Sequence, residues 1–166
     1  VIELLDMNIL QKLAQKLLDY GTKIVVIKCG KKGYYIRTQG KDILARMGKL
    51  QPADIDNWAD RELIEEIYHA PKVVSTTGAG DASIAGFLAT FIKGGTIEEA
   101  IKVACAVGAE CVQTYDAFSG IKTWDETMRL IQSGWEKDRI HIGGRYWRYD
   151  DGRSCWVGRY DRWFNA

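Results

Sequence analysis

Ser75-Thr76-Thr77-Gly78-Ala79-Gly80-Asp81-Ala82 is the stretch that decides the fold, and an apolar run with helical spacing follows it to Ile92. The two glycines and Ala79 let the backbone approach a ligand closely, because little or no side chain stands in the way. The first N–H groups of a helix have no partner within the helix, and the helix dipole adds partial positive charge there. The stretch therefore predicts an anion site, with a phosphate or a developing oxyanion as its guest.

Asp81 fits either of two roles at this position. A Gly-Ala-Gly-Asp turn can simply cap a helix, with the Asp81 carboxylate as the N-cap. A carboxylate repels phosphate, however, so Asp81 is also reasonable as a base that takes a proton from a hydroxyl attacking the phosphate. Two other phosphate-binding motifs are excluded, since no Gly-Lys-Ser/Thr follows the glycines and the G-x-G-x-x-G spacing is absent.

The longer string from Thr76 to Asp81, with Gly86 inside the following helix, resembles the C-terminal signature of the ribokinase-like (PfkB) carbohydrate kinases. The resemblance covers about residues 8–133. It implies a Rossmann-like three-layer α/β ribokinase fold, of which this chain carries only the C-terminal, nucleotide-binding half.

The resemblance also implies a role for each residue of the signature. Asp81 falls on the catalytic base of the family, which deprotonates the acceptor hydroxyl. Gly78, Ala79 and Gly80 fall on the anion hole that stabilises the phosphoryl group, and Thr77 is expected to bind the cofactor beside them. The implied cofactors are ATP and Mg²⁺, and the implied partners are ATP and a small-molecule sugar.

A second segment, from Lys23 to Ile36, has the pattern of a buried strand, a glycine turn and another strand. It resembles the strand-Gly-x-x-Gly-strand segment of the family, where the turn borders the nucleotide phosphates, so Gly30 and Gly33 are expected in that turn. Lys28 stands where the family usually carries Thr or Ser. It fits either a point charge near phosphate or a solvated lysine at a strand end.

An alanine-rich helix is expected at about residues 97–113, opened by a capping box of Thr96 and Glu99. By resemblance this helix lies where the family holds adenine, and Cys105 takes a position that is often Asn or His. Cys105 is therefore a candidate cofactor-binding residue, with core packing as the alternative.

The remaining elements follow from hydrophobic periodicity and turn residues. Their order predicts a layered α/β domain. The signature helix is expected to carry its apolar residues, Ile84 through Ile92, on one face. The other expectations are a helix over 8–20, a charged helical or loop stretch over 60–68, a short strand over 72–74 and a helix over 124–132.

The tail from residue 135 is expected to be a β-hairpin separate from the kinase part, which comprises residues 1–134. Arg145 to Asp150 and Ser154 to Gly158 flank an Asp-Gly turn. Tryptophans packed on the body, with arginines in water, are the favoured interpretation. Aromatics interleaved with arginines also fit single-stranded nucleic acid, although the tail's aspartates dilute the positive charge.

Composition limits the classes of function. The chain has 166 residues, 46% of them apolar, and a formal net charge of +1. This composition indicates neither a disordered chain nor the strongly basic charge of many nucleic-acid-binding proteins. No apolar run is long enough for a membrane span, so cytoplasm is the default. The spacing of the four cysteines and two histidines predicts no metal site, and we interpret all four cysteines as reduced thiols.

The sequence thus predicts an ATP-dependent phosphotransferase acting on an alcohol group of a sugar or sugar-like molecule. The alternative is a nucleotide- or sugar-sensing module without catalysis, favoured by Lys28 and by Ser75, which replaces an Asp found in many members. Nothing in the chain matches the family's sugar-binding elements, so this piece is expected to be incomplete on its own. A homodimer is possible, and the acceptor cannot be read from these residues.

Overall fold

The computed structural model describes residues 6–142 and 144–165. Its centre is a five-stranded sheet in the order β1-β2-β3-β5-β4, with every neighbouring pair antiparallel. The strands are β1 (Ile24–Lys28), β2 (Tyr34–Thr38), β3 (Glu62–Glu65), β4 (Trp147–Asp150) and β5 (Cys155–Gly158).

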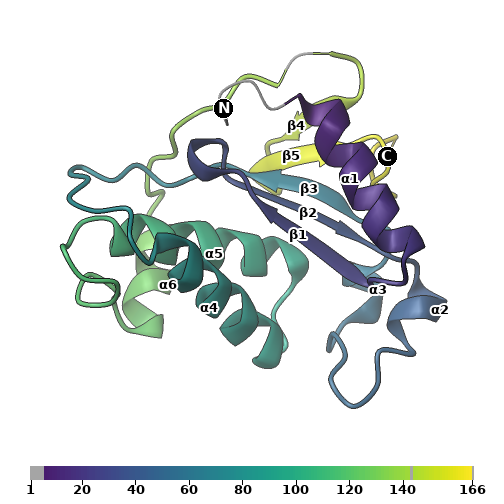
Figure 1. Cartoon of the computed structure of the whole chain (residues 1–166), viewed down its shortest axis with the longest axis horizontal. Helices are drawn as coiled ribbons and strands as arrows, with labels where there is room; N and C mark the ends of the chain where they lie inside the picture. The colour runs from purple at the N-terminus through teal and green to yellow at the C-terminus, as the bar shows by residue number, and fades with distance from the viewer. Residues whose placement is uncertain (1–5, 143, 166) are drawn as a thin grey trace.

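Helices cover both faces of the sheet, as Figure 1 shows: three long helices lie on one face and α1 lies on the other. This layering confirms the predicted α/β class. The long helices are α1 (Met7–Asp19), α4 (Ala79–Ile92), α5 (Ile97–Cys111) and α6 (Trp124–Gln132), and the short ones are η2 (Gly30–Lys32), α2 (Lys41–Leu44) and α3 (Ile55–Trp58).

Each face of the sheet has its own apolar core. On the α1 side, Leu10 and Leu18 pack with Val25, Tyr35 and Ile64. On the other side the central residue is Trp58, which is fully buried. The Trp58 ring meets the Phe91 ring edge-on, with 5.1 Å between the ring centroids. Because both faces are covered, β2 and β3 are buried along their whole length.

The apolar residues of α4 do not share one face, contrary to expectation. Phe87 and Phe91 point into the core, whereas Ile84, Leu88 and Ile92 are exposed. The predicted apolar face included both the buried and the exposed residues, because residues three apart and residues four apart both satisfy helical spacing.

Two local predictions are wrong. Residues 62–65, expected to be helical or looped, form the buried strand β3. Residues 72–74, expected to be a strand, lie outside the sheet, and the Val74 N–H donates to the carbonyl of Val112 at 2.8 Å. The predicted helices near 8–20, 97–113 and 124–132 are all present.

The predicted C-terminal hairpin forms, but it extends the sheet. Leu63 and Ile64 of β3 pair with Val157 and Trp156 of β5. Trp147 is buried in the α1-side core. Backbone pairing therefore joins the C-terminal segment to the strands ahead of it, while a domain boundary at residue 134 stays a prediction.

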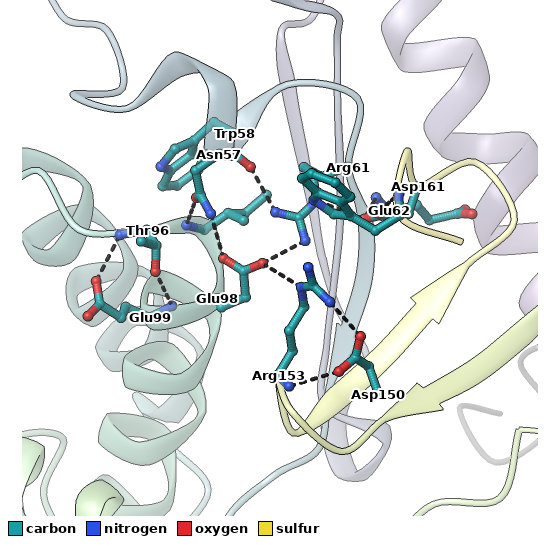
Figure 2. Close-up of polar contacts among 12 residues, drawn as sticks. Asn57, Trp58, Arg61, Glu62, Thr96, Glu98, Glu99, Asp150, Arg153 and Asp161 are labelled. Atoms are coloured by element: carbon teal, nitrogen blue, oxygen red, sulfur yellow. Dashed lines mark hydrogen bonds and ion pairs between the residues drawn. The ribbon is translucent and has the colours of Figure 1, made fainter. Parts of the chain in front are cut away.

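Buried charges reinforce this junction (Figure 2). Arg61 is fully buried, and its Nε donates to Asp161 Oδ2 at 2.9 Å. Its Nη2 donates to Glu98 Oε1 at 2.6 Å and its Nη1 to the Asn57 carbonyl at 2.8 Å. Burial disfavours the cation, but Glu98 and Asp161 outweigh this and raise the pKa of Arg61. One guanidinium thus connects β3, α5 and the C-terminus.

The carboxylates that follow Arg61 also hold the C-terminal segment. Glu62 accepts from the Tyr160 N–H at 3.0 Å, and Glu66 accepts from the Ile140 N–H at 2.9 Å. Glu65 forms an ion pair with Lys137. Burial raises the pKa of Glu65 to about 7, although Lys137 opposes the shift. Each of these three carboxylates thus has a partner in the last 30 or so residues, and Glu62 also accepts from Gln11 and Tyr35.

Gly33 lets the strands come together at the turn between β1 and β2. Its φ is +89°, and a β-carbon there would overlap the Glu65 carbonyl oxygen of β3. The position therefore requires glycine for two reasons, conformation and space.

Gly33→Ala is expected to lower the free energy of unfolding by about 2 kcal/mol or more, because backbone strain adds to the overlap. Urea denaturation measures the change. Gly21→Ala is the matched control, since Gly21 has φ +95° and nothing within 4 Å of an added β-carbon. The control places a β-carbon at a positive φ without the contact to Glu65, and its expected loss is about 1–2 kcal/mol. Equal losses in the two variants would show that contact with Glu65 is unimportant.

Candidate active site

The site lies at the N-terminus of α4, where the signature turn ends. Gly78 is the N-cap residue, with φ +81° in the left-handed region. A β-carbon at Gly78 would overlap Ala117 of the loop after α5, so this turn and that loop are in close contact. The left-handed Gly78 redirects the chain into the helix, so that the helix begins at Ala79.

Several N–H groups at this turn are free. The Ala79 N–H donates to the Thr76 carbonyl and the Ala82 N–H to the Gly78 carbonyl. Among the described residues, the N–H groups of Gly78, Gly80 and Asp81 have no hydrogen-bond partner. Three unpaired donors and the helix dipole favour an anion at this point. The Ala79 N–H, which the sequence analysis placed in the anion hole, is already bonded to Thr76, and the Asp81 N–H is free in its stead.

Lys28 brings a cation to the same point. It is the last residue of β1, and a β-carbon added to Gly80 would lie 2.8 Å from Lys28 Nζ. No acidic residue of the described chain pairs with this ammonium. A phosphate bound to the N–H groups would therefore meet a point charge that is not already neutralised.

Asp81 lies in the first turn of α4, two residues inside the helix, so the N-cap interpretation is wrong. Asp81 is exposed, and within the described ranges its carboxylate accepts no hydrogen bond and forms no ion pair. The carboxylate is available to a molecule that binds beside the anion site.

Thr77 and Ser75 shape the turn that precedes the helix. The Thr77 N–H donates to Ser75 Oγ at 3.2 Å, and Thr77 itself is exposed next to Gly78. Gly30 lies in η2 with φ +56°, in the turn that follows Lys28. The structure thus places Lys28 beside the signature turn that carries Thr77 to Asp81, and the glycine turn with Gly30 and Gly33 directly follows Lys28 in the chain.

Cys105 does not join this group. It is 4% exposed and faces the sheet, with its thiol 3.8 Å from the Glu65 carbonyl oxygen. Burial raises the pKa of the thiol well above its ordinary value. The geometry matches the core-packing alternative, and we leave Cys105 out of the proposed site.

Residues 2–124 match the model of the pfkB family carbohydrate kinases. The chain belongs to this family. A pfkB relative from Archaeoglobus fulgidus, an uncharacterised sugar kinase, is 31% identical over 120 residues, which cover 72% of this chain and 40% of the relative. The ribokinase of Arabidopsis thaliana is 28% identical over 112 residues, or 68% of this chain and 24% of that protein.

Solved structures of ribokinase-family kinases agree in fold. The structure of Arabidopsis thaliana ribokinase with ribose and ATP matches with a TM-score of 0.57 and 25% identity, over 74% of this chain and 33% of that one. The Methanocaldococcus jannaschii nucleoside kinase matches with a TM-score of 0.53 and 23% identity, over 67% and 30%. The chain therefore spans less than half the length of the kinases it matches.

No helix within the described residues is both long and apolar enough to span a membrane.

Proposed function

We propose that this chain is the nucleotide-binding part of an ATP-dependent kinase that phosphorylates a hydroxyl of a sugar or sugar-like small molecule. The observation that carries the proposal is the cluster at the start of α4: free N–H groups at Gly78, Gly80 and Asp81, the Lys28 ammonium beside Gly80, and an unpaired carboxylate. Phosphoryl transfer needs chiefly positioning and electrostatic stabilisation, which such a cluster supplies.

In this mechanism the N–H groups and Lys28 hold the transferring phosphoryl group and stabilise its negative charge. Asp81 accepts the proton of the acceptor hydroxyl as its oxygen attacks phosphorus. The bond from the γ-phosphorus to the bridging oxygen breaks, and ADP leaves.

Mg²⁺ fits this arrangement only as part of the nucleotide complex. The described residues hold no cluster of three or more metal-binding side chains, and Asp81 is the one carboxylate of the group. Mg²⁺ in kinases is commonly bound by one or two carboxylates plus substrate phosphates and water, which suits such a sparse site. When bound with ATP, the ion neutralises phosphate charge.

Lys28→Met is expected to weaken binding of a non-hydrolysable ATP analogue with Mg²⁺ by about 10- to 100-fold, because a charge-assisted contact with the γ-phosphate contributes about 1.5–3 kcal/mol. Isothermal titration calorimetry of the purified chain measures the affinity, and a thermal melt confirms folding. Lys12→Met is the control, since Lys12 is exposed on α1, across the sheet. Unchanged affinity in Lys28→Met would show that Lys28 is a solvated lysine at a strand end and does not contact phosphate.

The second candidate, a nucleotide- or sugar-sensing module without catalysis, gains support from Ser75, an uncharged residue whose Oγ accepts from the Thr77 N–H at the signature turn. It predicts that Mg-ADP binds but that no assembly containing the chain forms ADP from ATP and a sugar. If the purified chain is folded but does not bind Mg-ADP, both candidate functions are contradicted for the chain on its own.

A further inference from the structure

Three arginines and two tyrosines alternate in a row beside one end of the C-terminal hairpin. Arg37 Cζ lies 4.0 Å from the centroid of the Tyr160 ring, and Arg159 Cζ lies 4.6 Å from the same centroid. Arg159 Cζ is also 4.3 Å from the centroid of the Tyr146 ring, and Arg145 Cζ is 5.0 Å from it. Each tyrosine ring therefore lies within cation–π range of two guanidinium groups.

The register of the hairpin brings this row together. Trp147 and Gly158 form the pair of the β4–β5 ladder that is furthest from the turn, and beyond them the Arg159 N–H donates to the Tyr146 carbonyl at 2.9 Å. The two Arg-Tyr dipeptides of the tail thus meet at the open end of the hairpin. Arg37 of β2 joins them on the α1 side of the sheet, where α1 lies beside the end of the chain (Figure 1).

The three guanidinium groups of the row form no ion pair within the described residues. Arg37 donates to the Gln15 side chain at 2.6 Å, and Arg145 and Arg159 each donate to a tyrosine hydroxyl. The hydrogen bond from Arg145 and the charges of both arginines lower the pKa of Tyr146. Because like charges repel, the row is a place where an anion is favourable.

The aspartates of the tail do not offset this charge, contrary to expectation. Asp138, Asp150 and Asp161 are each engaged in an ion pair with a residue outside the row. Asp151 lies in the turn between β4 and β5, at the other end of the hairpin. The open end therefore keeps the positive charge of its arginines.

A groove of about 250 Å³ separates α1 from this end of the hairpin. Arg159 and Tyr160 line one side of it, and Lys16 of α1 adds a further cation on the other. Asp19 is the one carboxylate among its described lining residues, and it accepts from the Gln15 amide at 2.8 Å. The groove is therefore basic along most of its length.

We propose that the row and this groove bind single-stranded nucleic acid. Guanidinium groups stacked on rings keep N–H donors free in their own plane, and these donors match the geometry of phosphate oxygens. Proteins that bind single strands combine such a basic groove with aromatic rings on which bases stack, and the Tyr160 ring is partly exposed. The site lies on the α1 side of the sheet, whereas the proposed active site lies at α4 on the other side, so the two can act independently.

The test is fluorescence anisotropy of a labelled oligothymidylate of about 20 nucleotides with the purified chain. Binding is expected at about 50 mM salt and should weaken steeply toward about 200 mM. Replacing Arg145 and Arg159 together by glutamine should weaken it at least tenfold. The slope of log affinity against log salt should become shallower by about 1.4, because each phosphate contact with a single strand contributes about 0.7.

Arg162→Gln is the matched control. Arg162 is also exposed and lies over a ring, that of Trp163 at 4.5 Å, but it shares no ring with the row. Its affinity should stay within about twofold of the unaltered chain. Tyr160→Leu should weaken binding about fivefold or more while leaving the salt slope unchanged, because it removes stacking and no charge. Thermal melts confirm that each variant is folded.

Four results would overturn the proposal. Two are an absence of binding at low salt and a loss in Arg162→Gln as large as that in the double variant, which would indicate bulk charge. The third is inorganic polyphosphate that binds as tightly as the oligonucleotide, since recognition would then need no bases. The fourth is displacement of the oligonucleotide by a saturating ATP analogue with Mg²⁺, which would place its binding at the start of α4.

Discussion

Replacing Arg61 by methionine is expected to destabilise the fold by about 3–5 kcal/mol, because the change leaves the buried Asp161 carboxylate without its cation and Glu98 with only the more distant Arg153. Asp161 is fully buried and Glu98 largely so, and both accept hydrogen bonds from the one guanidinium. Since folded domains are stable by only 5–15 kcal/mol, such a loss removes a large share of the total. Urea denaturation followed by circular dichroism measures the loss.

Two further variants separate the buried network from general effects of charge. Arg61→Lys should rescue little of the stability, because a single ammonium cannot serve Asp161, Glu98 and the Asn57 carbonyl in three directions. Lys41→Met breaks an exposed ion pair with Asp56 and should have little effect on stability, because solvent screens such a pair. A loss in Arg61→Met as small as that in Lys41→Met would contradict the proposed importance of the network.

Asp81→Asn is expected to reduce phosphoryl transfer by about 10²- to 10⁴-fold in an assembly that contains this chain, because the amide cannot accept the hydroxyl proton. Mg-ADP affinity should stay the same or rise, since the substitution removes a negative charge from beside the phosphates. Turnover is measured as ADP formation in the presence of sugar, and affinity by calorimetry of the chain.

Asp125→Asn is the matched control for this experiment. Asp125 also lies in the first turn of a helix, α6, so its loss imposes a comparable change in helix electrostatics away from the site. Turnover should persist in this variant. If Asp81→Asn retained full turnover, the assignment of Asp81 as base would fall.

The turn and helix start that carry the proposed anion site could be predicted from the sequence because their parts are local. Gly78, Gly80 and Asp81 are neighbours in the chain, and a helix start provides the free N–H groups wherever it occurs. The position of Lys28 could not be predicted in the same way. Its ammonium reaches Gly80 only because β1 and α4 are brought together by the fold, across some 50 residues of sequence.

The charged residues in and beside β3 show what neighbouring residues alone cannot predict. Four charged residues within six positions favour a solvated loop or helix when only their neighbours are considered. Arg61 is buried because its partner Asp161 lies 100 residues further along the chain. Likewise, helical spacing places Ile84 and Phe87 in one apolar set, and only the packing of the sheet decides that Phe87 is the buried member.

The overlap between Gly33 and the Glu65 carbonyl bears on how members of this family can be classified. A descendant that had stopped using ATP would still need glycine at position 33, because the sheet requires it for folding. No such constraint from the sheet applies to the charges of Lys28 and Asp81, which have no partners in the described chain and could be lost without disturbing its packing. The presence of Gly33 therefore indicates only common ancestry, whereas Asp81, the proposed base, is the better indicator that catalysis has been kept.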